Sequence, residues 1–399
     1  MKHAFLFAAC LGVASTAAAQ VLPSEPMSLA GGRLVLGADA AVSVGEDDPG
    51  FFNYSDYEHN TLREVRLGVT ASVRATDRLS FLGELRSENF ENVWPFALYA
   101  RITPLPGRRL DIQIGRIPPT FGSFTRRAYG RDNPLIGYPL AYQYLTSLRA
   151  DAVPASADEL LRMRGRGWLS EFSIGNGEPD RGLPLVTAFR WDTGVQVSTG
   201  WRAIAAAFSV TNGSASNPRV SDDNSGKQLA ARITATPATG LVLGASWARG
   251  QFLTTRVMDA AAAGAGDDFV QRASGADIEY SRDRWLVRAD AVHSRWQIPL
   301  AAEPLSHGRL DAFAGSLEGR YTFLPGMYAA ARVEHLAFSR IAGRAATVAW
   351  DAPVSRVEIG GGYYLQRNAI ARVSWQHNDR EGGRTTRDSL VAAQLLFWF

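Results

Sequence analysis

The chain has 399 residues, of which 46% are hydrophobic and 20% are charged, and its formal net charge is +3. This length would suit two or three soluble domains, yet no linker rich in proline or serine and no block of charge divides it. Beyond the first residues, no stretch approaches the roughly eighteen apolar residues that a membrane-spanning helix needs, which excludes a helical membrane protein.

The first segment has the pattern of an export signal. Lys2 and His3 precede an apolar run over residues 4–13, and the alanines at 17–19 supply a small-residue cleavage site. We therefore predict a signal peptide over residues 1–19 and a single domain over residues 20–399. The only cysteine, Cys10, falls in the signal, so the mature chain has no thiol for a disulfide or a metal site.

The mature chain alternates apolar and polar side chains with the period of two that is typical of β-strands. Val65, Leu67 and Val69 share one face, for example, and Glu64 and Arg66 share the other. The apolar faces carry many small residues, whereas the opposite faces carry arginine and glutamate in segment after segment. This favours a lipid-facing exterior around a polar, water-filled interior over the packed core of a soluble sandwich. We predict sixteen strands, at 33–44, 61–75, 79–89, 93–103, 109–117, 185–198, 201–211, 227–236, 241–252, 269–281, 284–296, 310–323, 327–339, 353–365, 369–378 and 387–399.

The connectors between these segments alternate in length. Short ones lie at 76–78, 282–283 and 324–326, and longer polar ones at 45–60 and 212–226. Short periplasmic turns and long outer loops are typical of membrane barrels, and in lipid only helices and closed sheets pair every backbone group internally. We therefore predict an all-β fold, a closed antiparallel transmembrane β-barrel of about sixteen strands, with fourteen or eighteen as alternatives.

One connector is much longer than the rest. Two prolines at 118–119 end the fifth strand because they cannot donate to a ladder, and no clear strand follows until about Leu185. The segment 118–184 carries many aromatic residues and a short helix candidate at 158–163, which argues against disorder. By this count it is the third outer loop.

The last eleven residues alternate and then stop on an aromatic carboxy-terminus. Leu395, Phe397 and Phe399 share one face, and Gln394 lies on the other. This resembles the terminal strand of bacterial outer-membrane β-barrels, whose final phenylalanine is read by the barrel assembly machinery. The resemblance implies an outer-membrane location in a Gram-negative bacterium, in contact with membrane lipids and lipopolysaccharide.

The long connector resembles the third loop of sixteen-stranded porins, which folds into the lumen and narrows it. Residues 115–122 (GRIPPTFG) are also similar to a segment that ends a strand in phosphate-selective-type porins. The resemblance implies that 118–184 is a constriction loop, and it leaves open a homotrimer. Those porins carry basic ladders that include lysine, whereas Lys227 is the only lysine of the mature chain, so phosphate specificity does not follow.

Charged residues are the candidates for a selective site. Arginine keeps its charge at ordinary pH and binds oxyanions through a planar fork. The positions that we assign to the lumen carry both signs. The basic ones are Arg66, Arg74, Arg86, Arg101, Arg190, Arg232, Arg288, Arg320, Arg332, Arg356 and Arg372, and the acidic ones are Glu64, Glu84, Asp111, Asp192, Asp277, Glu279, Asp290, Glu318, Glu334 and Glu358. These charges are close to balanced, so a solvated, salt-bridged wall is one alternative. The excess of arginine lies in the long loop, where the candidate constriction residues are Arg126, Arg127, Arg131, Arg149, Arg162 and Arg164.

If the loop lines the constriction, its positive field would favour anions; the alternatives are contact with lipopolysaccharide phosphates or solvent. The sequence thus predicts a passive porin for small hydrophilic solutes with a mild anion preference, without a cofactor or a nucleic-acid partner. A plugged barrel that acts as an adhesin or anchor through its outer loops is the alternative. A hydrolase is the least favoured, because His335 falls on the predicted lipid face and His59 and His307 fall in loops. The aspartate pairs 222–223 and 267–268 could bind calcium in loops or simply be polar tips.

Overall fold

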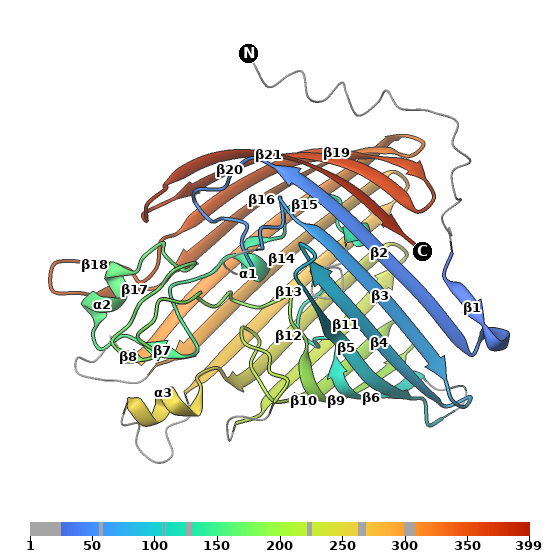
Figure 1. Ribbon diagram of the computed structural model, residues 1–399, viewed down its shortest axis with the longest axis horizontal. Helices are drawn as coiled ribbons and strands as arrows, with labels where there is room; N and C mark the ends of the chain where they lie inside the picture. Colours follow the sequence, from blue (N-terminus) through green and yellow to red (C-terminus); the bar gives the residue numbers. More distant parts are fainter. Residues whose placement is uncertain are drawn as a thin grey trace.

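Sixteen strands form one closed antiparallel barrel in the computed structural model, which describes residues 25–55, 59–105, 107, 109–124, 130–221, 226–261, 269–298 and 308–399 (Figure 1). Each strand pairs with the next along the chain, and the last pairs with β2 to close the wall. The strands are β2 Leu34–Gly45, β3 Val65–Arg74, β4 Leu79–Glu88, β5 Asn92–Ile102, β6 Arg109–Ile117, β9 Asp192–Trp201, β10 Ile204–Thr211, β11 Gln228–Ala238, β12 Leu241–Gln251, β13 Val270–Arg282, β14 Trp285–Gln297, β15 Arg309–Leu324, β16 Met327–Phe338, β19 Val354–Gln366, β20 Ala369–Arg380 and β21 Arg387–Trp398. The predicted fold is confirmed.

The remaining elements are short. They are β1 Met27–Leu29, η1 Ala30–Gly32, η3 Gly130–Asp132, α1 Leu140–Gln143, β7 Ala152–Val153, α2 Ala157–Arg162, β8 Ile174–Gly175, α3 Thr255–Ala260, β17 Arg340–Ala342 and β18 Thr347–Ala349. Over the described residues, no helix is long and apolar enough to cross a membrane. The predicted signal peptide, His307 and both aspartate pairs lie outside the described residues.

The two faces of each strand differ as the alternation predicts. On β16, Val333 is 48% exposed, whereas Arg332 and Glu334 on either side of it are buried. On β21, Leu395 is 51% exposed and Gln394 is 9% exposed. Apolar side chains therefore face outward, where lipid would be their solvent, and charged ones face the lumen.

The predicted strand at 185–198 was placed too early. Leu185, Val186 and Ala188 are buried, but Val186 N donates to the carbonyl of Ala141 at 3.0 Å, inside the long connector. These apolar residues pack within the lumen, so strand β9 begins only at Asp192. The connector consequently runs over residues 118–191.

The lumen is not polar throughout, which corrects the prediction of a polar, water-filled interior. A large apolar cluster joins Phe121 and Tyr142 of the long connector to Trp296 of the wall strand β14. Phe52 and Trp350, which lie in other connectors, belong to the same cluster. Each of these five side chains is at most 3% exposed. The connector brings its own aromatic residues into the barrel, and the wall beside it is apolar where the two meet.

Candidate pore constriction

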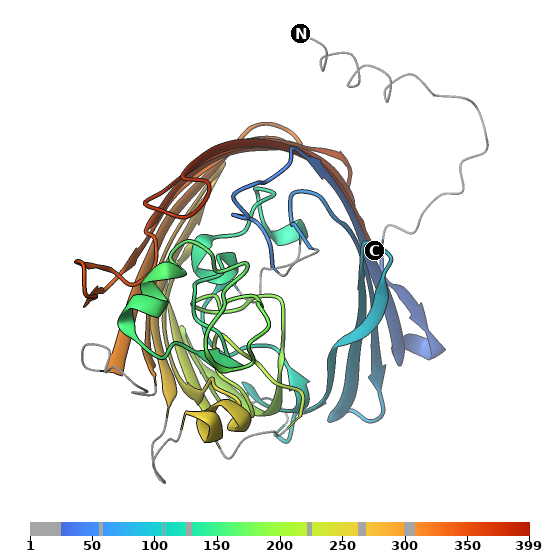
Figure 2. The ribbon, with the colours of Figure 1, turned by 60° about the vertical axis from the view of Figure 1, so that its left-hand side comes forward.

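The described part of the connector between β6 and β9, residues 118–124 and 130–191, runs largely inside the barrel (Figure 2). Near its start, Gly122 N donates to Ser246 Oγ of β12 at 3.0 Å. Further on, Ile136 N donates to Ser374 Oγ of β20 at 3.3 Å. This loop, which we call the lumen loop, therefore reaches two widely separated parts of the inner wall.

Carboxylates of the wall hold the lumen loop through its backbone. Gly137 N donates to Glu358 Oε1 and Leu140 N donates to Glu334 Oε1, both at 2.9 Å. A side chain at position 137 would begin only 2.7 Å from Glu358 Oε2, so any larger residue would have to displace this carboxylate. Hydrogen bonds to a charged acceptor are about twice as strong as neutral ones, and they fix this part of the loop against β16 and β19.

Arg332 is the centre of this anchor. Its guanidinium contacts Glu318 at 3.2 Å, Glu334 at 3.1 Å and Glu358 at 2.7 Å, and it donates to the carbonyl of Gly137 at 2.8 Å. Arg332 is only 1% exposed. One cation thus holds three carboxylates beneath the loop, where the backbone N–H groups of the loop supply the remaining donors.

Two more wall arginines hold the next loop residue, Tyr138. Arg66 Nη1 donates to the tyrosine hydroxyl at 2.6 Å, and Arg356 Nη1 donates to the tyrosine carbonyl at 3.1 Å. Arg356 also donates to the carbonyl of Phe52 at 2.9 Å. These arginines bind protein, and the loop covers them.

The residues assigned to the lumen therefore divide into three groups. Those beneath the loop, at contacts just described, are Arg66, Arg332, Arg356, Glu318 and Glu334. Those paired along the wall are Arg232 with Asp277 at 2.6 Å, Arg288 with Glu279 at 2.7 Å, Arg372 with Gln394 at 3.3 Å and Glu64 with Arg66 at 3.8 Å. Arg101 and Arg320 are more accessible, although Arg101 pairs with Asp111 at 2.9 Å.

The arginines predicted for the constriction are not brought together. Arg149 is 1% exposed, and its guanidinium is bound by Asp151 at 2.8 Å and by the carbonyls of Ser170 and Glu178. It therefore holds the loop together and cannot face a solute, which removes it from the set. Arg126 and Arg127 lie outside the described residues.

The other three arginines of that set are spread along the loop. Arg162 is exposed on α2, toward the loop-bearing end of the barrel (Figure 1), and Arg164 Nη2 donates to the carbonyl of Glu381 at 3.4 Å. Arg131 is accessible, with 55% of its side chain exposed. It lines a cavity of about 70 Å³ that also touches Asp39 of β2 and the terminal residue, Phe399.

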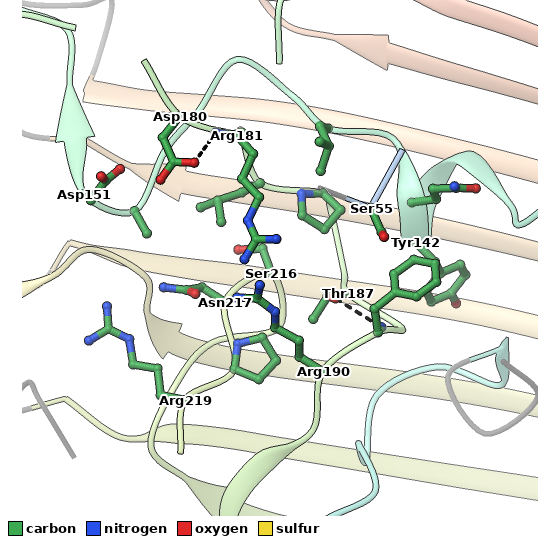
Figure 3. Close-up of a pocket in the computed structure, with 18 of the residues that line it drawn as sticks. Ser55, Tyr142, Asp151, Asp180, Arg181, Thr187, Arg190, Ser216, Asn217 and Arg219 are labelled. Carbon is green, nitrogen blue, oxygen red and sulfur yellow. Dashed lines mark hydrogen bonds between the residues drawn. The ribbon is translucent and has the colours of Figure 1, made fainter. Parts of the chain in front are cut away.

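Two adjoining cavities lie beside the lumen loop. The first has a volume of about 300 Å³ and the second of about 270 Å³, and both are lined by Ser55, Arg181, Phe189 and Arg190. Figure 3 shows the side chains of Arg181 and Arg190 approaching each other in the first cavity. Arg219 also lines this cavity, but it is only 8% exposed and donates to the carbonyl of Phe252 at 3.5 Å. The second cavity continues to β4, β5 and β6, where Glu88, Trp94 and Arg116 line it.

The two aspartates that line the first cavity, Asp151 and Asp180, accept hydrogen bonds from other parts of the chain. Burial alone would raise the pKa of Asp151, but hydrogen bonds from Arg149 and Asn176 outweigh it, and the pKa is lowered. Asp180 Oδ1 accepts from the backbone N–H of Arg181 at 2.7 Å. Three arginines and two aspartates line this cavity, so its lining carries a small positive excess.

Sequence analysis assigned Arg190 to a strand and did not select Arg181 or Arg219. Arg181 falls within the predicted loop 118–184 and Arg219 within the predicted connector 212–226. Both could have been selected as candidates, because the sequence already placed them in connectors at the loop-bearing end of the barrel. The depth of each residue in the lumen depends on the path of the loop, which periodicity does not describe.

Comparisons with known proteins give the fold. No family model and no curated protein matches the sequence. Among solved structures, a loop-deletion variant of OmpT, an outer-membrane protein of Vibrio cholerae, matches with a TM-score of 0.56 at 12% identity, over 92% of this chain and 99% of that one. The outer-membrane channel DcaP of Acinetobacter baumannii matches with 0.53 at 12% identity, over 94% and 100% of the two chains. OmpF of Salmonella typhi, in complex with daunomycin, matches with 0.53 at 10% identity, over 92% and 97%.

At these identities the likeness concerns architecture alone. The chain has the fold of an outer-membrane, porin-like barrel.

Proposed function

We propose that this barrel is a passive diffusion channel for small hydrophilic solutes, with a mild preference for anions. The observation that carries the proposal is the pair of adjoining cavities beside the lumen loop, at the arginines 181, 190 and 219. Solved barrels of the same fold include one protein described as a channel and one described as a porin. The mechanism is electrodiffusion, controlled by the free cross-section and by fixed charge.

We assign the anion preference mainly to arginines that the sequence did not select for the constriction. Arg181 and Arg190 line both cavities, and Arg219 lines the first. At ~0.1 M salt the Debye length is about 10 Å, comparable to a narrow passage, so these charges act on every ion that crosses it. Arg131 stays in the proposed set, together with Arg126 and Arg127, which the sequence alone places in the loop.

Conductance in a planar bilayer tests the proposal. We expect ohmic single-channel steps, and the double substitution Arg181→Glu with Arg190→Glu should shift the zero-current potential in a salt gradient toward cations, most at low ionic strength. Arg162→Glu with Arg166→Glu is the matched control, because both residues are exposed and neither lines the two cavities. A protein that folds but conducts no current would contradict the proposal.

A plugged barrel that adheres or anchors through its outer loops remains the second candidate. The apolar cluster that joins the lumen loop to the wall favours it, since a filled lumen passes no solute. The bilayer measurement separates the two candidates, because a plugged barrel gives no steps under conditions where a porin gives large ones.

We do not propose an enzyme. His335 Nδ1 contacts Ser355 Oγ at 2.9 Å, and His377 Nδ1 contacts Ser389 Oγ at 2.7 Å. A hydrolytic triad also needs an acid on the other ring nitrogen, and within the described part of the chain no such contact is found for either histidine. Solvent-exposed hydrogen bonds on the outer wall account for both pairs.

A homotrimer is part of the proposal as well. A solved OmpT of Vibrio cholerae, in-vitro folded, is described as a trimer form, with a TM-score of 0.52 and 11% identity to this chain. Sedimentation in detergent would test whether this barrel associates in the same way.

A further inference from the structure

The second cavity carries one accessible charge of each sign. Arg190 of the lumen loop and Glu91 of the turn between β4 and β5 both line it, and both residues are exposed. Glu91 lies 3.7 Å from His59 Nε2, and over the described residues no ion pair joins Glu91 to Arg190. The two charges therefore face the same cavity without closing it by a direct contact.

Glu91 stands on a turn that is fixed to the wall. Its backbone N–H donates to the carbonyl of Glu88 at 3.1 Å. Asn89 N donates to the carbonyl of Val65 at 2.7 Å, and Val65 N donates back to Asn89 Oδ1 at 3.1 Å. The turn is thus bound to the start of β3, which holds the backbone that carries Glu91 in place.

Arg190 is held on the wall by the residue that follows it. Trp191 is buried and packs against Phe96 of β5, with 4.9 Å between the ring centroids. Its carbonyl accepts a hydrogen bond from Arg116 Nε of β6 at 3.2 Å. The end of the lumen loop is therefore docked on the barrel wall, and Arg190 lines the cavity from there.

The two signs come from different elements. Glu88 lies on the same hairpin as Glu91, and Arg181 lies in the same loop as Arg190, and all four residues line the cavity. A solute between the hairpin and the loop therefore meets carboxylates on one side and guanidinium groups on the other. This arrangement depends on where the charges lie and not on the net charge of the cavity.

Two half-buried aromatic rings line the same cavity. Trp94 comes from β5 and Phe189 from the lumen loop. Aromatic side chains offer a large, rigid apolar contact for another ring. The cavity volume of about 270 Å³ lies near the lower end of the roughly 300–1,000 Å³ that is usual for small-molecule sites, so the cavity fits one compact solute.

We propose that the second cavity binds a zwitterionic α-amino acid with an aromatic side chain, as a saturable step on the way through the channel. The inference rests on the proposed function and names a substrate class for the same site. Arg190 donates to the carboxylate of the solute, whose planar shape suits the guanidinium fork, and Glu91 accepts from its ammonium group. The ring of the solute packs against Trp94 and Phe189. A solute with only one charge gains one of these contacts and is repelled by the group at the other side.

A series of four small molecules tests the site in the wild-type barrel. The series is L-phenylalanine, 3-phenylpropionate without the ammonium group, 2-phenylethylamine without the carboxylate, and L-alanine without the ring. Phenylalanine should reduce the potassium chloride current in a planar bilayer until the effect saturates, and calorimetry in detergent should give the same affinity. Each of the other three should bind roughly five- to tenfold more weakly, which corresponds to one ion pair between the exposed and the buried limits.

Two single variants separate the two charges of the site. Glu91→Gln should weaken the binding of phenylalanine by roughly five- to tenfold and leave 3-phenylpropionate unchanged or tighter, because the repelling carboxylate is gone. Arg190→Gln should weaken both ligands. The ratio of the two affinities within one variant does not depend on the fraction of protein that is folded. The matched control is Arg166→Gln with Glu171→Gln, since both residues are exposed in the lumen loop and neither lines the two cavities, and it should bind all four molecules as the wild type does.

Three results would overturn the site. Equal affinity of the wild type for phenylalanine and 3-phenylpropionate would show that the ammonium group is not recognised, and equal affinity for alanine would remove the aromatic class. Unchanged binding of phenylalanine by Glu91→Gln would remove the assigned partner. The proposed channel is judged separately: ohmic steps without any binding of phenylalanine would overturn the site alone, whereas binding measured by calorimetry without ohmic steps would support the site and contradict the channel.

Discussion

The inside of the barrel has two sides that use the same residue types differently. On the side of β15, β16 and β19, the lumen loop covers Arg332, Arg356 and three glutamates, and these charges bind the loop. On the side of β4, β5 and β6, the wall borders a cavity, and Arg116 and Glu88 line it. An inward-facing charge therefore contributes to the pore only where the loop leaves it uncovered.

The two sides also differ in what a substitution should cost. Breaking a buried ion pair by removing one partner costs about 3–5 kcal/mol, because an uncompensated charge stays behind. An accessible pair contributes about 0–1 kcal/mol. Arg332 is of the first kind, and Arg101, whose side chain is 48% exposed beside Asp111, is nearer the second.

The largest effect is expected on the covered side. Arg332→Met should leave Glu318, Glu334 and Glu358 without their shared cation and destabilise the loop anchor by about 3–5 kcal/mol. Single-channel conductance should rise and fluctuate as the loop detaches, and denaturant unfolding should begin earlier. Arg101→Met is the control, for which we expect near wild-type behaviour in both measurements. If both variants behaved alike, the distinction between covered and open sides would be lost.

A smaller effect is expected at the seam, which belongs to both sides. Phe399 N donates to the carbonyl of Ala38 at 2.9 Å, and Ala38 N donates back to Phe399 O at 3.0 Å. Deleting Phe399 removes this pair and the aromatic end that resembles an assembly signal. The amount of folded, heat-modifiable protein in the outer membrane should fall several-fold. Phe90→Ala, at an exposed aromatic residue of a different turn, should assemble normally, and equal losses in both variants would count against the signal.

The smallest effect is a pH response at Glu64, a buried residue between the covered Arg66 and two residues of the second cavity, His59 and Glu88. Glu64 lies in the connector just ahead of β3, and burial raises its pKa to about 7, although Arg66 at 3.8 Å favours the charged form. A carboxyl with a raised pKa is neutral below that value, so Glu64 gains its charge only as the pH rises through about 7. Lowering the pH from 8 to 6 should therefore shift the zero-current potential slightly toward anions.

Glu64→Gln should reduce that shift, because the amide does not titrate. A pH response of the same size in this variant would assign the effect to another group near the second cavity, such as His59 or Glu88. The measurement needs low ionic strength, where a single fixed charge is screened least.

Much of the wall could be predicted from the sequence, because successive residues of a strand face the lipid and the lumen in turn. The predicted strand 109–117 coincides with β6, and the outward positions Val333, Leu395 and Trp375 are exposed as the alternation requires. The long connector was also recognisable, since the prolines at 118–119 end a ladder and aromatic residues follow. These features depend on local pattern and on solvent alone.

The site was harder to predict because it depends on contacts between distant segments. Arg149 and Arg181 have the same chemistry and lie in the same loop, yet one is enclosed by Asp151 and two carbonyls while the other lines both cavities. Nothing in the local sequence separates them. The difference arises from how the loop folds against itself, which only the three-dimensional path shows.

One edge of β2 pairs with β3, and the other pairs with both ends of the described chain. Met27–Leu29 pairs with residues 34–36, Phe399 pairs with Ala38, and β21 pairs with residues 39–45. A fusion tag added after Phe399 would therefore find the next positions along the edge already occupied by β1. Its first residue would have to turn away from the wall, so purification tags placed in an exposed outer connector should disturb this barrel less than tags at its carboxy-terminus.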